Sequence, residues 1–408
     1  MNWLASLLLR LCAIVLTIGF AIPLADAAAQ LLPVCSWPFE SDGRGITNVF
    51  TPDTNATYWI MPFDTGSWQS MIIRGRYPAA RFINFDTYTS TGAVTDSIID
   101  SNITPDQGST NPFATQMVNN GSQNYTIAVG TNTIRAPNSL HVGGSRMVFV
   151  IYRAFVPDQG FNRTGGVGLP AVTLVAPNGT MRRLRPCPFA NAETSLGNLI
   201  TLLGTNGFTN AANFLRQILT ALNQRLSGAS LCTPGQPGPA AVTFAPATLG
   251  ANFFANPQTT YLETSGLCFQ PNKIIVVRGK APVFPNTYYG GSIFQPAFDS
   301  QIQLRYWSMC NNDRVLPYPV VACQADFETN LDQNQFYTYV VSNDPAPPPW
   351  LPDYATWLPW GDTRLPKNLI FRNLLPMSNF TVSGEYYPQA VFCDETVFSQ
   401  QGWQACFR

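Results

Sequence analysis

Six arginine residues recur in the same order in the two halves of the chain, and their side chains could bind an anion. A guanidinium group presents N–H donors that fit a carboxylate or phosphate in a two-point contact. Because an unpaired buried charge is costly, the same arginines could instead form internal ion pairs or stack on Tyr and Phe rings. Their duplication favours this structural role. Arg81 and Arg305 are the candidate binding residues within the full set of Arg74, Arg81, Arg153, Arg278, Arg305 and Arg372.

An oxygen-rich loop occurs in the first unit only, in a segment rich in turn-forming residues. Asp96, Asp100, Asp106 and Asn111 offer oxygen ligands of the kind that calcium binds, although their spacing departs from an EF-hand loop. Alternatively, acids between Asp86 and Asp106, with Asp96 and Asp100 as candidates, could act as acid and base in a glycoside or ester hydrolase. Sequence does not give the separation of these carboxylates. The sequence therefore does not decide whether the protein is an enzyme, although on balance it argues against catalysis.

Four aromatic residues lie in a proline-rich segment of the second half. They could form a stacking platform for the rings of a neutral glycan or for a small apolar ligand. They could equally form a lid that closes the edge of a sheet. This candidate binding set is Trp350, Tyr354, Trp357 and Trp360.

Nucleophilic catalysis finds little support in the chain. His141 is the single histidine, it precedes an expected strand, and no Gly-x-Ser-x-Gly turn occurs. Every cysteine of the mature chain has a potential disulfide partner. The phosphate-binding loop and the dinucleotide-binding fingerprint are also missing from the sequence.

The composition argues against nucleic acid as a partner. Lys+Arg and Asp+Glu both number 23, and charged residues make up only 11% of the chain. A protein with this balance has no net positive charge to attract a polyanion. Its polar surface must rest on neutral groups, which suits neutral glycans and is also typical of exported β-proteins.

The first 30 residues have the features of a secretory signal peptide. Arg10 precedes an apolar run over 11–24, and small residues follow at 25–29. No later stretch approaches the length of a membrane-spanning helix. We therefore expect a secreted, periplasmic or cell-envelope protein with no transmembrane anchor after cleavage.

Eight cysteines remain after residue 30, and an even number in an exported chain indicates four disulfides. Their full pairing does not follow from the sequence. The short separations favour two local pairs, Cys310–Cys323 and Cys393–Cys406.

The elements that must position these residues form a repeat, because 58–157 and 260–376 carry the same landmarks in the same order. A two-residue period with aromatic and β-branched residues predicts a strand at 81–88, and the repeated landmarks predict matching strands in the second copy, whereas 96–113 is expected to be a loop. The sequence predicts a mainly β fold with two internally duplicated, antiparallel, jelly-roll-like β-sandwich units. Helical spacing at 192–203 and 210–226 predicts an insertion between them. The expected segments are a signal peptide (1–30), a first β unit (31–186), a helical insertion with a Pro/Gly linker (187–250) and a second β unit with a disulfide tail (251–408).

Several ordered motifs add a resemblance. They are Arg76-Tyr77-Pro78-x-x-Arg81-Phe82, the segments 105–113, 165–170 and 357–361, and Arg305-Tyr306-Trp307-Ser308. Together they resemble a family of uncharacterised secreted bacterial proteins. The second unit is also similar to a domain of unknown function in bacterial cell-envelope proteins. The resemblance implies export and a β-rich fold, and it supplies no catalytic residues.

These observations favour an exported binding or structural β-protein whose ligand is a neutral glycan or a small apolar molecule. A secreted hydrolase and a subunit of a surface assembly, with an envelope partner, are the alternatives. No cofactor is expected apart from the calcium considered above, and the sequence leaves the oligomeric state open.

Overall fold

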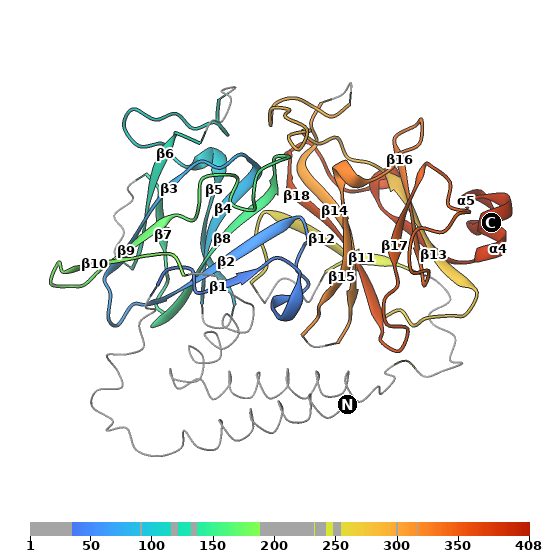
Figure 1. Ribbon diagram of the computed structural model, residues 1–408, viewed down its shortest axis with the longest axis horizontal. Helices are drawn as coiled ribbons and strands as arrows, with labels where there is room; N and C mark the ends of the chain where they lie inside the picture. Colours follow the sequence, from blue (N-terminus) through green and yellow to red (C-terminus); the bar gives the residue numbers. More distant parts are fainter. Residues whose placement is uncertain are drawn as a thin grey trace, which may run out of the picture.

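The computed structural model contains two β units side by side (Figure 1). The predicted signal peptide, both predicted helices and the Pro/Gly linker lie outside the residues that the structure describes. Those residues are 35–89, 92–115, 121–131, 137–187, 232, 242–247, 254–298, 301–315 and 317–408.

The first unit is a sandwich of two five-stranded sheets. One sheet is antiparallel, and we call it the larger sheet because it has the longest strands. In order, it contains β1 (Phe39–Ser41), β2 (Ala56–Asp64), β8 (Met147–Pro157), β4 (Ala80–Thr89) and β5 (Val94–Ile99). The outer sheet contains β10 (Met181–Leu184), β9 (Ala171–Val175), β3 (Ser70–Arg76), β6 (Asn124–Gly130) and β7 (Ser139–His141).

The second unit repeats this arrangement. In order, its larger sheet contains β11 (Phe244–Pro246), β12 (Thr259–Thr264), β18 (Lys367–Pro376), β14 (Leu304–Asp313) and β15 (Val320–Ala325). The outer sheet contains β17 (Ala355–Pro359), β16 (Phe336–Ser342), β13 (Lys273–Lys280) and β19 (Gln389–Asp394). Two short helices, α4 (Glu395–Gln401) and α5 (Trp403–Cys406), follow at the outer end (Figure 1).

Each unit has its own apolar core between its two sheets. In the first unit the core includes Trp59 and Phe85 from the larger sheet and Ile73 and Ile127 from the outer sheet. The alternation of buried and partly exposed residues along β3 and β6 follows from the two-residue period of a strand. By contrast, β4, β8, β14 and β18 are buried on both faces, because the larger sheets of the two units also pack toward each other at the centre of the molecule.

The predicted duplication extends to backbone details. In the first unit β2 pairs with β8, and β8 pairs with β4. In the second unit β12 pairs in the same way with β18, and β18 pairs with β14. Val156 and Leu375 occupy matching places at the ends of β8 and β18. Their φ angles are 47° and 50°, and their N–H groups donate to Asn55 and Gln258 respectively. A positive φ is rare for such residues, so its occurrence in both copies is strong support for a shared framework.

Some sequence expectations about the elements were wrong. The segment 96–113 was expected to be a loop, but it contains most of β5 and the 3-10 helix η3 (Asp100–Asn102). β5 is an edge strand with little burial, so its polar residues concealed it. The strand β11 lies inside 187–250 yet belongs to the second unit. The sheets are also not wholly antiparallel, because β6–β7 and β16–β17 are parallel pairs.

Four disulfides join the eight cysteines that follow residue 30. Both local pairs suggested by the spacing are present, and Cys310 and Cys323 face each other on the paired strands β14 and β15. The other two pairs are Cys35–Cys187 and Cys232–Cys268. Among the described residues, no helix has both the length and the hydropathy needed to cross a bilayer.

Candidate functional site

Two ion pairs cross the boundary between the units. Arg81 on β4 donates to Asp326 of the second unit at 2.5 Å, and Arg305 on β14 donates to Asp100 of the first unit at 3.1 Å. All four side chains are buried. Arg81 and Arg305, the candidate binding arginines, therefore lie against carboxylates of the opposite unit.

The two carboxylates have matching surroundings. Asp100 begins η3, and Asp326 begins the 3-10 helix η5 (Asp326–Glu328). Asp100 also accepts a hydrogen bond from the Ile83 N–H on β4, and Asp326 accepts one from the Trp307 N–H on β14. Burial raises the pKa of both to about 6, against the opposing effect of the arginines. Both are therefore ionised at neutral pH, and the pairs hold the units together as charged contacts.

A cavity of about 460 Å³ lies between the units, and we call it the inter-unit cavity. The strands β2, β8, β12 and β18 line it, together with residues 49–52 and 254–256. Its charged lining residues are Arg153, Arg314, Arg372 and Glu263, and most of the remaining lining is apolar or tyrosine. The two units contribute equivalent strands, so the cavity is a product of the duplication.

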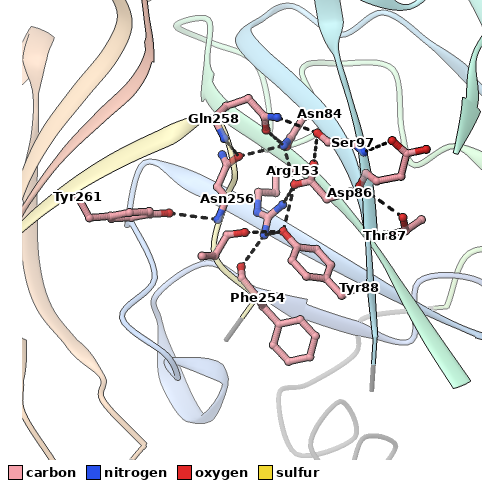
Figure 2. Close-up of polar contacts among 12 residues, drawn as sticks. Asn84, Asp86, Thr87, Tyr88, Ser97, Arg153, Phe254, Asn256, Gln258 and Tyr261 are labelled. Carbon is pink, nitrogen blue, oxygen red and sulfur yellow. Dashed lines mark hydrogen bonds and ion pairs between the residues drawn. The ribbon is translucent and has the colours of Figure 1, made fainter. Parts of the chain in front are cut away.

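Arg153, on β8, is fully paired through its terminal nitrogens (Figure 2). Nη1 forms an ion pair with Asp86, and Nη2 donates to the Tyr88 hydroxyl at 2.7 Å and to the Phe254 carbonyl at 2.8 Å. Burial raises the pKa of Asp86, and Arg153 opposes that rise. Asp86 also accepts from Ser97 at 2.5 Å.

Amide side chains extend this network across the boundary between the units (Figure 2). The Asn84 amide donates to Asp86, to Gln258 at 2.8 Å and to Asn256 at 3.2 Å. Gln258 in turn donates to Ser97 at 2.7 Å. The first unit's arginine is thus enclosed by hydrogen bonds that the second unit helps to supply.

Arg372, on β18, occupies the equivalent position with a different set of partners. Its Nη2 donates to the Thr51 carbonyl at 2.5 Å, which matches the contact of Arg153 with Phe254. Its guanidinium lies over the Tyr261 ring, 6.0 Å from the centroid. None of the ion pairs among the described residues includes Arg372, and its buried Nη1 has no hydrogen-bond partner there.

Two equivalent tyrosines, one from each unit, also line the inter-unit cavity. Tyr58 lies opposite Arg153 across β2–β8, and Tyr261 lies opposite Arg372 across β12–β18. Each hydroxyl accepts a hydrogen bond from the backbone N–H of a preceding turn residue, Asp53 or Asn256. Burial and then Asp53 raise the pKa of Tyr58, whereas Arg372 counteracts them, so the cation of one unit acts on the phenol of the other.

The structure separates the four residues considered for calcium. Asp96 accepts from the backbone of Ser97 and His141, whereas Asp100 is paired with Arg305. The ligand atoms of Asp96, Asp100 and Asp106 do not lie within 4.8 Å of one another. Asp106 accepts from Thr126, and Asn111 holds the backbone of Asp100, Ile103 and Phe113.

The candidate aromatic platform is divided between two packing clusters. Trp360 is buried against Phe269 in the core of the second unit, and Trp350 packs on Phe398 beside Tyr354. Trp357 donates its indole N–H to Ser342. Of the four, only Trp357 lies on β17, the edge strand of the outer sheet, so the structure does not bring the set together as one platform.

The remaining residues considered above lie apart from the inter-unit cavity. His141 is exposed, and its Nδ1 accepts from the Gly143 N–H. Arg278 pairs with Asp332 at 2.5 Å and lies 3.8 Å from the centre of the Trp403 ring. Arg74 is exposed on β3.

Sequence reasoning missed Tyr58, Tyr261 and Asp53 as members of one site. A signal was present, because Asp53-x-Asn55 and Asn256-x-Gln258 stand at the same distance before the two tyrosines. Asp53 is fully buried and accepts from Tyr306 and Ser308 of the second unit.

Comparison with known proteins gives information on the fold alone. No protein-family model and no curated protein matches the chain. The crystal structure of an uncharacterised protein from Burkholderia cenocepacia is similar with a TM-score of 0.52 and 12% identity, covering 90% of this chain and 85% of that one. A protein from Vibrio parahaemolyticus has a TM-score of 0.42 and 11% identity, covering 85% of this chain and 91% of that one.

Proposed function

We propose that this protein is an exported binding protein that holds a small ligand in the inter-unit cavity. The observation that carries the proposal is the cavity itself, about 460 Å³ in volume and lined by both units. Ligand sites in proteins typically have volumes of about 300–1,000 Å³, with mostly apolar walls and a few placed polar groups. The lining of this cavity fits that description.

The lining favours a ligand with an apolar body over a glycan. Ile60, Ile151, Phe155 and Ile370 supply aliphatic and aromatic surface, and few exposed amide or carboxylate groups face the cavity. Sugar rings need many hydrogen-bond partners, because each buried hydroxyl left unpaired costs free energy. Of the two ligand classes that the sequence suggested, the apolar one therefore fits better.

Export is part of the proposal and rests on two observations. Four disulfides are typical of proteins that work in an oxidising compartment. The first 30 residues also have the pattern of a signal peptide. Disulfides and buried ion pairs would keep the cavity preformed, which lowers the entropy cost of binding.

The test is titration of the purified protein with N-phenyl-1-naphthylamine, a neutral apolar probe whose fluorescence rises in an apolar site. We expect saturable binding at one site per chain. Ile60→Trp, which adds bulk to a half-buried wall residue, should weaken binding at least ~10-fold, equivalent to about 1.4 kcal/mol.

Met181→Trp is the matched control, because Met181 is exposed on β10 and does not line the cavity. It should bind the probe as the wild type does. Absence of saturable binding, or equal binding by Ile60→Trp, would overturn the proposal.

A further inference from the structure

We infer that the ligand of the inter-unit cavity is an amphipathic monocarboxylate, an apolar chain or ring with one carboxylate, and that Arg372 binds its carboxylate. This inference rests on the proposed function, because it specifies the ligand of the same cavity. It comes from comparing Arg372 with Arg153, its equivalent in the other unit.

The duplication gives Arg372 an internal reference. Arg153 and Arg372 lie at the same register position, opposite Tyr58 and Tyr261 respectively. Each donates Nη2 to a backbone carbonyl of the facing turn. They differ in their other partners, since Arg153 has the Asp86 carboxylate and the Tyr88 hydroxyl, whereas Arg372 has no carboxylate within 4 Å among the described residues.

The missing carboxylate has a structural cause. The position of Asp86 on β4 corresponds to Cys310 on β14, whose sulfur is bonded to Cys323. Asp53 approaches this region from the other unit, but its oxygens accept from Tyr306, Ser308 and the Asn55 N–H. Arg372 therefore lines the cavity as a cation that no carboxylate of the described residues contacts directly.

The buried Arg372 guanidinium would be stabilised by an anion supplied by a ligand. Arg372 is 4% exposed, and its Nη1 is buried with no hydrogen-bond partner among the described residues. An unpaired donor of this kind is costly, more so when it carries charge, and a ligand oxygen would satisfy it. The Thr51 carbonyl and the Tyr261 ring hold the guanidinium plane, and because Nη1 is buried, a ligand oxygen would reach it through a displacement of the cavity wall.

The charge balance of the lining favours a single negative charge on the ligand. Asp86 neutralises Arg153, and Glu263 and Arg314 carry opposite charges. Arg372 has the buried Asp53 in its neighbourhood, and among the described residues the two form no ion pair. A phosphate monoester carries roughly −1.5 to −2 charges and three acceptor oxygens, which exceeds what one guanidinium edge can serve. A carboxylate matches Arg372 in both charge and shape.

The test compares decanoate with 1-decanol, which share an alkyl chain and differ in the head group. Each displaces N-phenyl-1-naphthylamine from the wild-type protein, from Arg372→Gln and from the control Arg74→Gln, whose exposed side chain on β3 does not line the cavity. We expect the wild type and Arg74→Gln to prefer decanoate by about 10-fold or more, the effect of one charge-assisted hydrogen bond. Arg372→Gln, which removes the charge and keeps a polar side chain, should bind both compounds equally.

A second readout needs no variant. Lowering the pH until the carboxyl group of decanoate is protonated should remove the preference of the wild type while 1-decanol binding stays constant. Equal affinities in the wild type at neutral pH, or a preference that survives in a folded Arg372→Gln variant, would overturn the inference and leave the proposed binding function standing. If the probe and both decyl compounds fail to bind, the proposed function itself falls.

Discussion

Asp86 and Cys310 occupy the same position in the two units. Asp86 lies opposite Ile151 on one side and Ser97 on the other, whereas Cys310 lies opposite Ile370 and Cys323. In the first unit the position carries a carboxylate that neutralises Arg153. In the second it carries half of a disulfide. Equivalent strands thus hold Arg153 beside a carboxylate and Arg372 without a carboxylate partner among the described residues.

This difference predicts that Arg153 and Arg372 contribute unequally to stability. Arg153→Met should lower the free energy of unfolding by about 3–5 kcal/mol, because it leaves the buried Asp86 carboxylate without its cation. Arg372→Met leaves no carboxylate of the described residues without an ion-pair partner and should cost less than about 2 kcal/mol, mainly through lost packing. Urea unfolding of both variants measures the difference.

The double variant Asp86→Asn/Arg153→Met serves as the control. It removes both charges together, so it should recover part of the stability that Arg153→Met loses. Equal costs for the two single substitutions would show that the two arginines have the same electrostatic surroundings after all.

The crossing ion pairs predict that the two units unfold together. Arg81–Asp326 and Arg305–Asp100 link them, and one apolar cluster contains both Phe82 and Tyr306. Asp326→Ala should destabilise the protein by about 3–5 kcal/mol, because Arg81 is left buried and unpaired.

Differential scanning calorimetry tests this cooperativity. The wild type should show one transition with matching calorimetric and van't Hoff enthalpies. Asp332→Ala, which removes an ion pair within the second unit alone, is the control and should cost less because its carboxylate is partly exposed. Two separate transitions in the wild type would contradict the prediction.

The framework could be predicted from sequence because its signals are local or repeated. The strand around Arg81 has a two-residue period with aromatic and β-branched residues, and the landmarks recur in order around Arg305, so the duplicated β units were predictable. The partners of these arginines were not, since Asp326 and Asp100 lie 245 and 205 positions away in the other unit. No local pattern encodes a contact over that separation.

The candidate site shows the same limit. Arg153 and Arg372 were recognised as members of the repeat, and a structural role was favoured for all six arginines. What separates the two is the residue at the Asp86 position, and its relation to each arginine becomes visible only once the register of β4, β8, β14 and β18 is known. The cavity depends on how two large sheets face each other, which residue type alone does not specify.

The buried acids predict an unusual dependence of stability on pH. Burial raises the pKa of Asp100 and Asp326 to about 6, above the value near 4 of an unfolded chain. Between pH about 4 and about 6 the folded state therefore binds more protons than the unfolded state. These two groups should make the free energy of unfolding fall as pH rises through that window, by up to about 1.4 kcal/mol per pH unit each.

The reference for this measurement is Asp100→Asn/Asp326→Asn, which cannot titrate at these positions. The stability difference, wild type minus variant, should decrease from pH 4 to pH 6 and then level off. A difference that grows over the same range would mean that the arginines outweigh burial and hold both pKa values below the unfolded value.

Matching glycine–tyrosine contacts in the two outer sheets give a final prediction. A Cβ added at Gly279 would lie 2.3 Å from the Tyr337 hydroxyl oxygen, and one added at Gly75 would lie 2.4 Å from that of Tyr125. Gly279→Ala should therefore cost about 1–3 kcal/mol through overpacking. Tyr337→Phe alone should be nearly neutral, because the buried hydroxyl has no hydrogen-bond partner among the described residues.

The double variant Gly279→Ala/Tyr337→Phe should be more stable than the sum of the single effects predicts, because removal of the hydroxyl relieves part of the clash. Relief stays partial, since the ring carbon Cζ of Tyr337 would still lie 2.7 Å from the new methyl group. Urea unfolding of the four proteins in the cycle gives a coupling free energy, expected at about 1 kcal/mol. Gly75→Ala with Tyr125→Phe repeats the experiment in the first unit. Additive effects in both units would show that tyrosine and glycine do not limit each other, and that the glycines serve the backbone instead.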